Sequence, residues 1–453
     1  MPSLPLSRRS WLALCAAALL TSCASAPPPP STPVVFVHGN GDSAALWITT
    51  LWRFESNGWP RERLHAIDMP LPTARDNDAV AQPGRSSATE FAQHLAAEVD
   101  AVLARTGARQ VALVGNSRGG NAIRHYVQNL GGAAKVSAVV LGGGTSHGVW
   151  ADPAFLPGSE FNGAGPFLQQ LNAPKGPAGD EVTPGVRWMT IRSDRNDKFA
   201  QPDGVWIGRR GQPTNITYDG PALKGAQNVV LPGRDHREVS YHADAFAETF
   251  RFIAGRAPAT TDVRSEARVL LDGRVSAPGT NVPLPGATIE VHAVDAATGE
   301  RQGPPLLRRT VGADGRWGPL ELSSTQPVEF VLSATGYATS HVYRGPFPRS
   351  SSVVHLRADR IADADRDAAA VVTLARPRGY FGLPRDRIVL DGQSPAPGIP
   401  PGVAGVASSK VKLRETGRAV VGEYTTEGGR TERLVGRAWP LAENHVVTLE
   451  LTW

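Results

Sequence analysis

The chain has 453 residues, of which 41% are apolar and 20% are charged, a balance that is typical of globular proteins and excludes a disordered or fibrous one. Its net charge is only +5, and without a long basic run we expect no nucleic-acid partner. The two cysteines, Cys15 and Cys23, lie near the N-terminus, so we predict neither a disulfide nor a cysteine-based metal site in the folded body.

The first 26 residues have the pattern of an export signal. A pair of arginines, Arg8 and Arg9, precedes an apolar stretch at residues 11–20. This stretch is shorter than the roughly 18 apolar residues that a membrane-spanning helix needs. We therefore predict that residues 1–26 hold a signal peptide that directs export, and that they do not form a membrane-spanning helix.

The end of this segment leaves two modes of export open. Residues 20–23, Leu-Thr-Ser-Cys, resemble the lipobox of bacterial lipoproteins, which implies a lipidated Cys23 at the mature N-terminus and attachment to a membrane. The small residues at 24–26 suit plain secretion instead. The proline-rich run 27–33 predicts a short linker in either case. The expected location is the cell envelope, as an outer-membrane lipoprotein, or the exterior.

Residues 34–257 alternate short β-branched runs with amphipathic helices. This alternation predicts a mostly parallel, doubly wound sheet covered by helices on both faces. Strands are expected at 34–38, 64–67, 110–114, 136–141, 187–191 and 228–231. A capping box at 87–90 begins one helix, whose apolar residues recur with helical spacing from Phe91 onward, and a second helix is expected over 241–255.

The sequence pattern changes after residue 257. Residues 258–266 are small and polar and predict a linker, and residues 267–453 are short alternating runs broken by turn residues. This pattern predicts an all-β sandwich or barrel. It contains two candidate sub-domains, of which 267–356 resembles the transthyretin-like sandwich of carboxypeptidase regulatory domains and 357–453 is a further β region.

The run QVALVGNSRGG at residues 110–120 predicts a nucleophile elbow centred on Ser117. Gly115 and Gly119 lie two residues before and after the serine, which permits a turn sharp enough to lift its Oγ above the sheet at the start of a helix. The alternative is an ordinary strand-to-helix turn with a surface serine. A serine nucleophile also needs backbone donors for an oxyanion, a base and an acid.

The strand from residue 34 supplies the candidate donors. It leads into His38-Gly39-Asn40-Gly41, whose glycines let a backbone N–H point into a site. We assign the N–H groups of Asn40 and Arg118 to an oxyanion hole, and we give His38 a structural role.

Two carboxylates compete for the acid. Asp197 follows the strand at 187–191 in a D-x-apolar-x-x-Pro context, whereas Asp194 is the runner-up that we expect to cap the turn. His236, in a glycine-containing loop before the last helix, is the candidate base, and His242 is expected to be packed on that helix. No His, Asp and Glu cluster has the spacing of metal ligands, so we predict neither a metal nor another cofactor.

Residues 34–257 carry, in chain order, the HGNG loop, the GNSRGG elbow, the candidate acid and the candidate histidine. In this order they resemble lipases and esterases of the α/β-hydrolase superfamily, in a minimal bacterial form. Residues 144–148 also resemble a lipase stretch, and the β region makes the whole similar to archaeal lipases with a lipid-binding β domain. The resemblance implies a carboxylic-ester hydrolase with hydrophobic acyl-ester substrates. Asn116 and Arg118 depart from the family pattern around the serine, and the Arg118 side chain is expected to place charge near the site mouth.

Two other functions stay open at this point. One is a polyester or aromatic-ester hydrolase that uses the β region to dock on a surface, and the other is a non-catalytic binding lipoprotein. The aromatic-bearing segment 148–185 is either a lid or a set of pinned loops. Residues 267–453 contribute no candidate to the site, so we expect them to form a separate core, unless they pack over the hydrolase and stabilise it.

Overall fold

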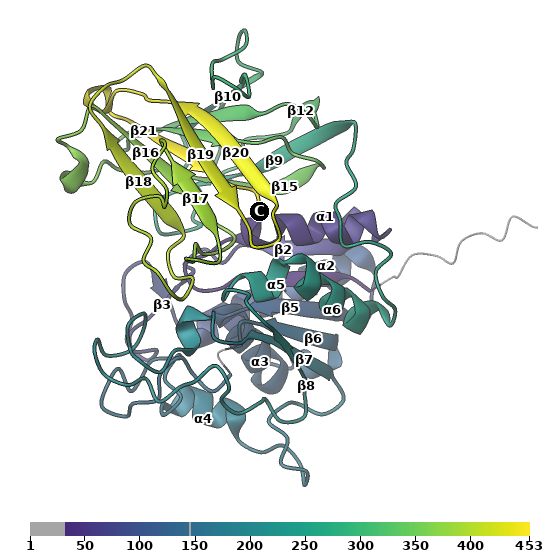
Figure 1. The fold of residues 1–453 in the computed structure, drawn as a ribbon. Helices are drawn as coiled ribbons and strands as arrows, with labels where there is room; N and C mark the ends of the chain where they lie inside the picture. Colours follow the sequence, from purple (N-terminus) through teal and green to yellow (C-terminus); the bar gives the residue numbers. More distant parts are fainter. Residues whose placement is uncertain (1–31, 145) are drawn as a thin grey trace, which may run out of the picture.

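The computed structural model describes residues 32–144 and 146–453. The predicted signal peptide, its Cys23 and most of the proline-rich linker lie outside the described residues, as does Thr145. In the described residues a helix-covered sheet forms one part of the molecule and a strand-rich part lies against it (Figure 1). Within these ranges, no helix combines the length and the apolar character needed to cross a membrane.

Six parallel strands form the first sheet, in the order β2-β1-β5-β6-β7-β8. Their bounds are β1 Val34–Val37, β2 Leu64–Ile67, β5 Val111–Asn116, β6 Val136–Gly142, β7 Arg187–Ser193 and β8 Gln227–Leu231. The β-branched run of β1 is buried along its whole length, because helices cover both faces of the sheet. The chain moves outward from β1 in both directions, and the predicted doubly wound α/β core is confirmed.

Helices on the two faces seal this sheet. They are α1 Ile48–Ser56, α2 Ala88–Thr106, α3 Arg118–Asn129, α5 Glu238–Tyr241 and α6 Ala243–Ala254, whereas the short helix α4 Pro166–Asn172 packs on α3. The predicted capping box begins α2, where Ser87 accepts from the Glu90 N–H and the Glu90 carboxylate accepts from the Ser87 N–H. The helix predicted over 241–255 is α6, which begins only at Ala243 because the extended backbone of His242 (ψ 162°) separates it from the short helix α5.

The C-terminal strands form one seven-stranded sheet and two three-stranded sheets, in agreement with the predicted all-β region. These strands are β9 Arg268–Ser276, β10 Thr288–Ala293, β11 Leu307–Thr310, β12 Leu320–Ser323, β13 Val328–Ser333, β14 Thr339–Arg344, β15 Ser351–Arg357, β16 Ala370–Ala375, β17 Arg387–Leu390, β18 Ser408–Leu413, β19 Ala419–Thr425, β20 Thr431–Arg437 and β21 His445–Glu450. The last strand, β21, pairs with both β14 and β16. The two candidate sub-domains therefore share a sheet.

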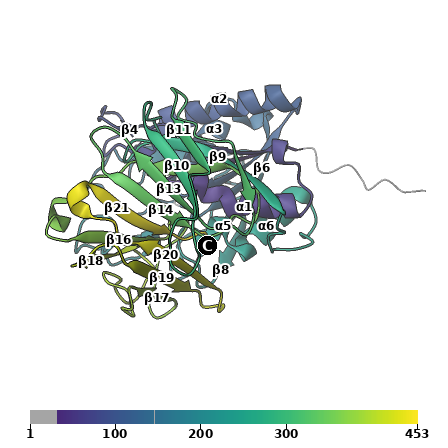
Figure 2. The same cartoon turned by 90° about the horizontal axis from the view of Figure 1, so that it is seen from above.

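The strand-rich part packs directly on the helix-covered sheet, and both views show α1 between them (Figures 1 and 2). Ile48 and Trp52 of α1 belong to the same apolar cluster as Trp317 and Phe330 of the β region. The Trp52 indole N–H also donates to the Ser350 carbonyl at 2.9 Å. The expected separate core is therefore wrong for this side of the β region, because part of its core is contributed by α1.

Polar contacts continue the interface. The Asn281 side chain donates to the carbonyls of Asp42 and Met69, each at 2.8 Å. The predicted linker is held as well, since the Asn57 side chain donates to the Thr260 carbonyl at 2.8 Å. These bonds give the interface a fixed geometry, which a flexible tether between independent domains would lack.

A chain that ends at Ala257 should fail to give soluble, cooperatively folded protein. Truncation would expose Trp52, which is 1% exposed, and would leave the buried Asp235 and Glu238 without their arginine partners. An unpaired buried charge costs about 3–5 kcal/mol, a large share of the roughly 5–15 kcal/mol that stabilises a domain. Soluble yield and near-ultraviolet circular dichroism measure the outcome, and a monomeric fragment with a sharp unfolding transition would contradict the prediction.

Candidate active site

Ser117 occupies the turn between β5 and α3 in a strained backbone conformation. Its φ is 52° and its ψ is −121°, and its N–H donates to the Gly142 carbonyl at 2.9 Å. Close packing explains the neighbouring glycines, since a Cβ on Gly119 would lie 2.5 Å from the Val37 oxygen and one on Gly115 would lie 2.7 Å from a side-chain methyl group. The turn therefore has the geometry that a nucleophile elbow requires.

His236 lies against Asp197 at the carboxyl ends of β7 and β8. The His236 Nδ1 is 2.9 Å from both carboxylate oxygens of Asp197, and the two residues are 2% and 6% exposed. The Phe199 ring packs edge-on against the imidazole, with ring centroids 4.4 Å apart. With Nδ1 donating to Asp197, the other ring nitrogen carries the lone pair. In the described chain that Nε2 is buried and has no hydrogen-bond partner.

The second candidate acid has a different role in the structure. Asp194 accepts hydrogen bonds from the Gly233 N–H at 3.1 Å and from the Ser193 hydroxyl at 3.3 Å. It holds the loop after β8 and does not contact the imidazole. Of the two carboxylates singled out in the sequence, Asp197 is the one positioned to orient His236.

His38 fixes the loop that follows β1. Its Nε2 accepts from the Met69 N–H at 3.1 Å, so its Nδ1 carries the proton and donates to the Gly39 carbonyl at 2.8 Å. Burial lowers the pKa of His38, which favours this neutral, bridging form. The Asn40 side chain accepts from the Ala74 N–H at 2.8 Å, and this contact also holds the loop.

The two backbone groups assigned to the oxyanion hole belong to the loop after β1 and to the residue that follows Ser117. Asn40 and Ser117 line one cavity, and within the described chain the Asn40 N–H has no protein acceptor. Arg118 is the first residue of α3, so its N–H is one of the donors that a helix N-terminus leaves unpaired. The positive φ of Gly41 (71°) lets the loop turn back beneath this cavity.

The expectation that the Arg118 side chain places charge near the site mouth is wrong. The side chain is fully buried and donates to the Pro72 carbonyl at 2.8 Å, to the Ser86 carbonyl at 2.7 Å and to the Glu160 carboxylate. Its guanidinium also lies over the Phe91 ring, 4.8 Å from the ring centroid. The buried Glu160 carboxylate, on the 148–185 segment, thus holds the Arg118 guanidinium away from the cavity.

The Arg118–Glu160 pair gives a pH-dependent contribution to stability. Burial raises the pKa of Glu160 to about 7, against the opposing effect of Arg118. A carboxyl whose folded pKa exceeds its unfolded value stabilises the fold fully below the unfolded pKa, and that stabilisation is lost as the pH rises through 7. The free energy of unfolding should therefore fall by up to about 3 kcal/mol between pH 4.5 and 7 in the wild type relative to Glu160→Gln. Urea unfolding at several pH values tests this, with the exposed-site variant Glu62→Gln as control, and parallel pH curves for wild type and Glu160→Gln would contradict it.

We call the space shared by these groups the site cavity. It has a volume of about 90 Å³ and is lined by Gly39, Asn40, Asp42, Asn116, Ser117, Val149, Phe161, Phe199, Ile207, His236, Arg237 and Tyr380. Its apolar wall comes partly from the 148–185 segment, through Val149 and Phe161, so this segment covers the site as a packed wall. Arg237 and Asp42 pair with each other at 3.1 Å, which neutralises the charges beside the cavity.

Two residues of the site were missed in the sequence. The Asn116 side chain donates to the His236 carbonyl at 3.1 Å and to the Ser240 hydroxyl at 2.8 Å, so it ties the histidine loop to the elbow. Its place directly before the serine was the available signal. Tyr380 comes from the β region, and nothing in the local sequence points to the cavity. Across residues 32–144 and 146–453, no three His, Cys, Asp or Glu side chains are grouped so as to hold a metal ion.

Comparison with known proteins gives two family matches. Residues 32–208 match the α/β hydrolase fold family, and residues 267–361 match the lipase C-terminal domain family. Similar solved structures include a Bacillus licheniformis lipase in its propeptide form, which is 13% identical with a TM-score of 0.35, over 90% of this chain and 94% of that one. Aspergillus fumigatus lipase B is 17% identical with a TM-score of 0.34, over 51% of this chain and 54% of that one. Phospholipase PlaB from Legionella pneumophila is 13% identical with a TM-score of 0.33, over 74% of this chain and 95% of that one.

Proposed function

Because the chain joins an α/β-hydrolase domain to a lipase C-terminal domain, we propose that it is a serine carboxylic-ester hydrolase with Ser117 as nucleophile. The observation that carries the proposal is the Asp197–His236 pair, whose imidazole lines one cavity with the strained Ser117. The unpartnered Nε2 of His236 supports its role as the base, since a base must have a free lone pair. The alternative, a non-catalytic binding lipoprotein, would have no use for this arrangement.

The proposed reaction proceeds through an acyl-enzyme. The Ser117 Oγ attacks the ester carbonyl carbon while its proton moves to the His236 Nε2, and Asp197 stabilises the resulting imidazolium. The N–H groups of Asn40 and Arg118 bind the oxyanion. The tetrahedral intermediate then breaks the bond to the alcohol, which leaves with the Nε2 proton. Water attacks the acyl-enzyme with His236 again as base, which releases the carboxylic acid and restores Ser117.

The small apolar cavity favours a short acyl group. Its volume of about 90 Å³ is smaller than the roughly 150 Å³ cavity that takes one benzene molecule. Phe161, Phe199 and Ile207 form its apolar wall, and the Arg118 charge is absent from it. We therefore propose hydrophobic esters with acyl chains of a few carbons as the substrates.

The experiment is a kinetic comparison of nitrophenyl acetate, butyrate, octanoate and palmitate on the purified protein. The values of kcat/KM should be highest for the two short esters and should fall at octanoate. A maximum at octanoate or palmitate would overturn the short-acyl assignment but would leave ester hydrolysis standing. Absence of turnover on all four esters would contradict the hydrolase itself and favour a binding lipoprotein.

We also propose export with lipidation at Cys23. The support is the sequence pattern alone, namely the Leu-Thr-Ser-Cys run after an apolar stretch. One acyl chain holds a protein on a membrane only marginally, so stable attachment needs two or more chains. Intact-mass analysis of protein made in a bacterial host should give a lipidated N-terminus at Cys23. A soluble product that begins at Pro27 would establish plain secretion.

A further inference from the structure

The turn that carries His236 is built around two buried carboxylates. Asp235 is fully buried and accepts from the N–H groups of Arg237 at 2.8 Å and Glu238 at 2.9 Å. The Glu238 carboxylate in return accepts from the Asp235 N–H at 2.8 Å. The position of the imidazole therefore depends on two carboxyl groups that have almost no access to water.

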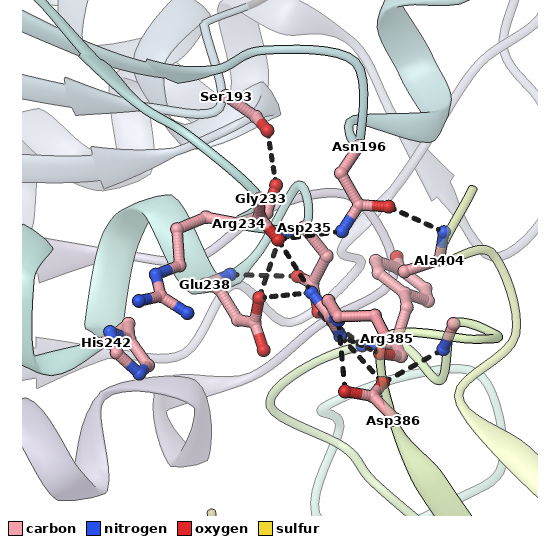
Figure 3. A network of polar contacts seen from close by, with 12 residues as sticks. Ser193, Asn196, Gly233, Arg234, Asp235, Glu238, His242, Arg385, Asp386 and Ala404 are labelled. Atoms are coloured by element: carbon pink, nitrogen blue, oxygen red, sulfur yellow. Dashed lines mark hydrogen bonds and ion pairs between the residues drawn. The ribbon is translucent and has the colours of Figure 1, made fainter. Parts of the chain in front are cut away.

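The cations that face these carboxyl groups come from the β region at residues 267–453, which we call the C-terminal domain. Arg376 donates to Asp235 at 2.9 Å and to Glu238 at 2.5 Å. Arg385 donates to the other oxygen of Glu238 at 2.8 Å and to the Gly233 carbonyl at 3.0 Å. Figure 3 shows Arg385 reaching from the C-terminal domain onto Glu238 and the start of this turn.

The two arginines also keep the Glu238 side chain of this turn ionised. Burial works to raise the pKa of Glu238, but Arg376 and Arg385 outweigh burial and hold that pKa below its usual range. Glu238 is therefore a carboxylate in the folded protein, and its two oxygens stay available to both arginines. A charged, bidentate contact fixes direction as well as distance, which a neutral pair would do less well.

The same segment of the C-terminal domain reaches the acid loop. The Asn196 side chain accepts from the Ala404 N–H and donates to the Gly233 carbonyl, each at 2.9 Å, and thus lies between the two domains (Figure 3). Asn196 directly precedes Asp197. The Tyr380 N–H donates to the Asp235 carboxyl group at 2.7 Å, and Tyr380 also lines the site cavity.

We propose that Arg376 and Arg385 are positioning residues for catalysis, which hold His236 in register with Asp197 and Ser117 and make the C-terminal domain part of the active site. The expected effect on catalysis rests on the proposed function. The coupling between the His236 turn and the arginines does not depend on that function. A displacement of about 1 Å at a reacting group can cost roughly 10²-fold in rate, so loss of this hold should appear mainly in kcat. Neither arginine lines the site cavity itself, although both donate to the carbonyl of its lining residue Tyr380, at 2.7 Å and 3.1 Å.

Arg385 is the better of the two for a test, because Arg376 is more deeply buried. In the full-length protein, Arg385→Gln should lower kcat on nitrophenyl acetate by roughly 10²-fold, with KM nearly unchanged. Arg385→Lys, which keeps a cation, should restore part of kcat. The matched control is Arg301→Gln, which breaks an ion pair with the buried Glu329 (2.6 Å) inside the C-terminal domain. An unchanged kcat for Arg385→Gln, or an equal loss in the control, would overturn the proposal.

Hydrogen exchange supplies a readout that needs no activity. Amides of residues 232–242 should exchange faster in Arg385→Gln than in the wild type, and Arg301→Gln should leave them unchanged. Unchanged exchange in Arg385→Gln overturns the proposal even if kcat falls, whereas faster exchange in a protein without esterase activity supports the coupling and refutes the proposed function. If Arg385→Gln does not fold, the double variant Glu238→Gln with Arg385→Gln takes its place with the same expected results, because it removes both charges of the Arg385–Glu238 pair and leaves only Asp386 without its arginine.

Discussion

Ser117→Ala should lower kcat for ester hydrolysis by roughly 10⁴-fold or more while the protein stays folded. The substitution removes the single oxygen that attacks the substrate, and the remaining donors at Asn40 and Arg118 can only bind the carbonyl. His236→Ala should cause a loss of the same order, because an un-ionised hydroxyl is a weak nucleophile. The double variant should be no worse than either single one, since the two residues act as a unit.

Steady-state kinetics on nitrophenyl acetate, with circular dichroism for folding, measures these losses. Ser137→Ala is the matched control, because Ser137 lies on β6 and its hydroxyl donates only to the Val111 carbonyl, at 3.2 Å. Near-normal turnover in Ser117→Ala or His236→Ala would remove that residue from the mechanism.

Asp197→Asn should lower kcat by roughly 10⁴-fold, because an amide opposite Nδ1 favours the wrong imidazole tautomer. Asp194→Asn is the matched variant, since it changes a carboxylate on the same loop that holds the Gly233 N–H. It should keep most of kcat and should lose about 1 kcal/mol of unfolding free energy with its hydrogen bonds.

The comparison needs kcat and a denaturant midpoint for each variant. The opposite ranking, with Asp194→Asn inactive and Asp197→Asn active, would mean that the imidazole uses the other carboxylate during turnover. The 2.9 Å contacts between Asp197 and His236 argue against that outcome.

The local sequence pattern was enough to predict the parallel-sheet core and the chain order of the candidate site residues. The central strands β1 and β5 are buried on both faces, so their β-branched runs stand out from the helices around them. The elbow was predictable for a similar reason, because the close approach of Val37 to Gly119 leaves no room for a Cβ. Although Val37 lies far from Gly119 in sequence, the glycine that this contact requires stands in the motif itself, so the elbow is recognisable from local sequence.

The remaining features depend on partners distant in sequence. The Arg118 side chain is buried because Glu160 and the Ser86 carbonyl meet it there, and neither partner is visible from the elbow motif. The arginines that hold the His236 turn lie in the C-terminal domain, where Arg376 reads as an ordinary polar residue after β16. The mixing of the two candidate sub-domains likewise depends on β21, whose alternating pattern does not specify its neighbours.

The most direct test of a serine mechanism is mass spectrometry after treatment with a fluorophosphonate, which reacts with an activated serine. The wild-type protein should gain one phosphonyl group, and the modified peptide should contain Ser117. Ser117→Ala should gain none, and His236→Ala should react far more slowly, because the hydroxyl then lacks its base. A wild-type protein that stays unmodified, or a Ser117→Ala protein that is labelled as fast as the wild type, would contradict the assignment of Ser117 as the nucleophile.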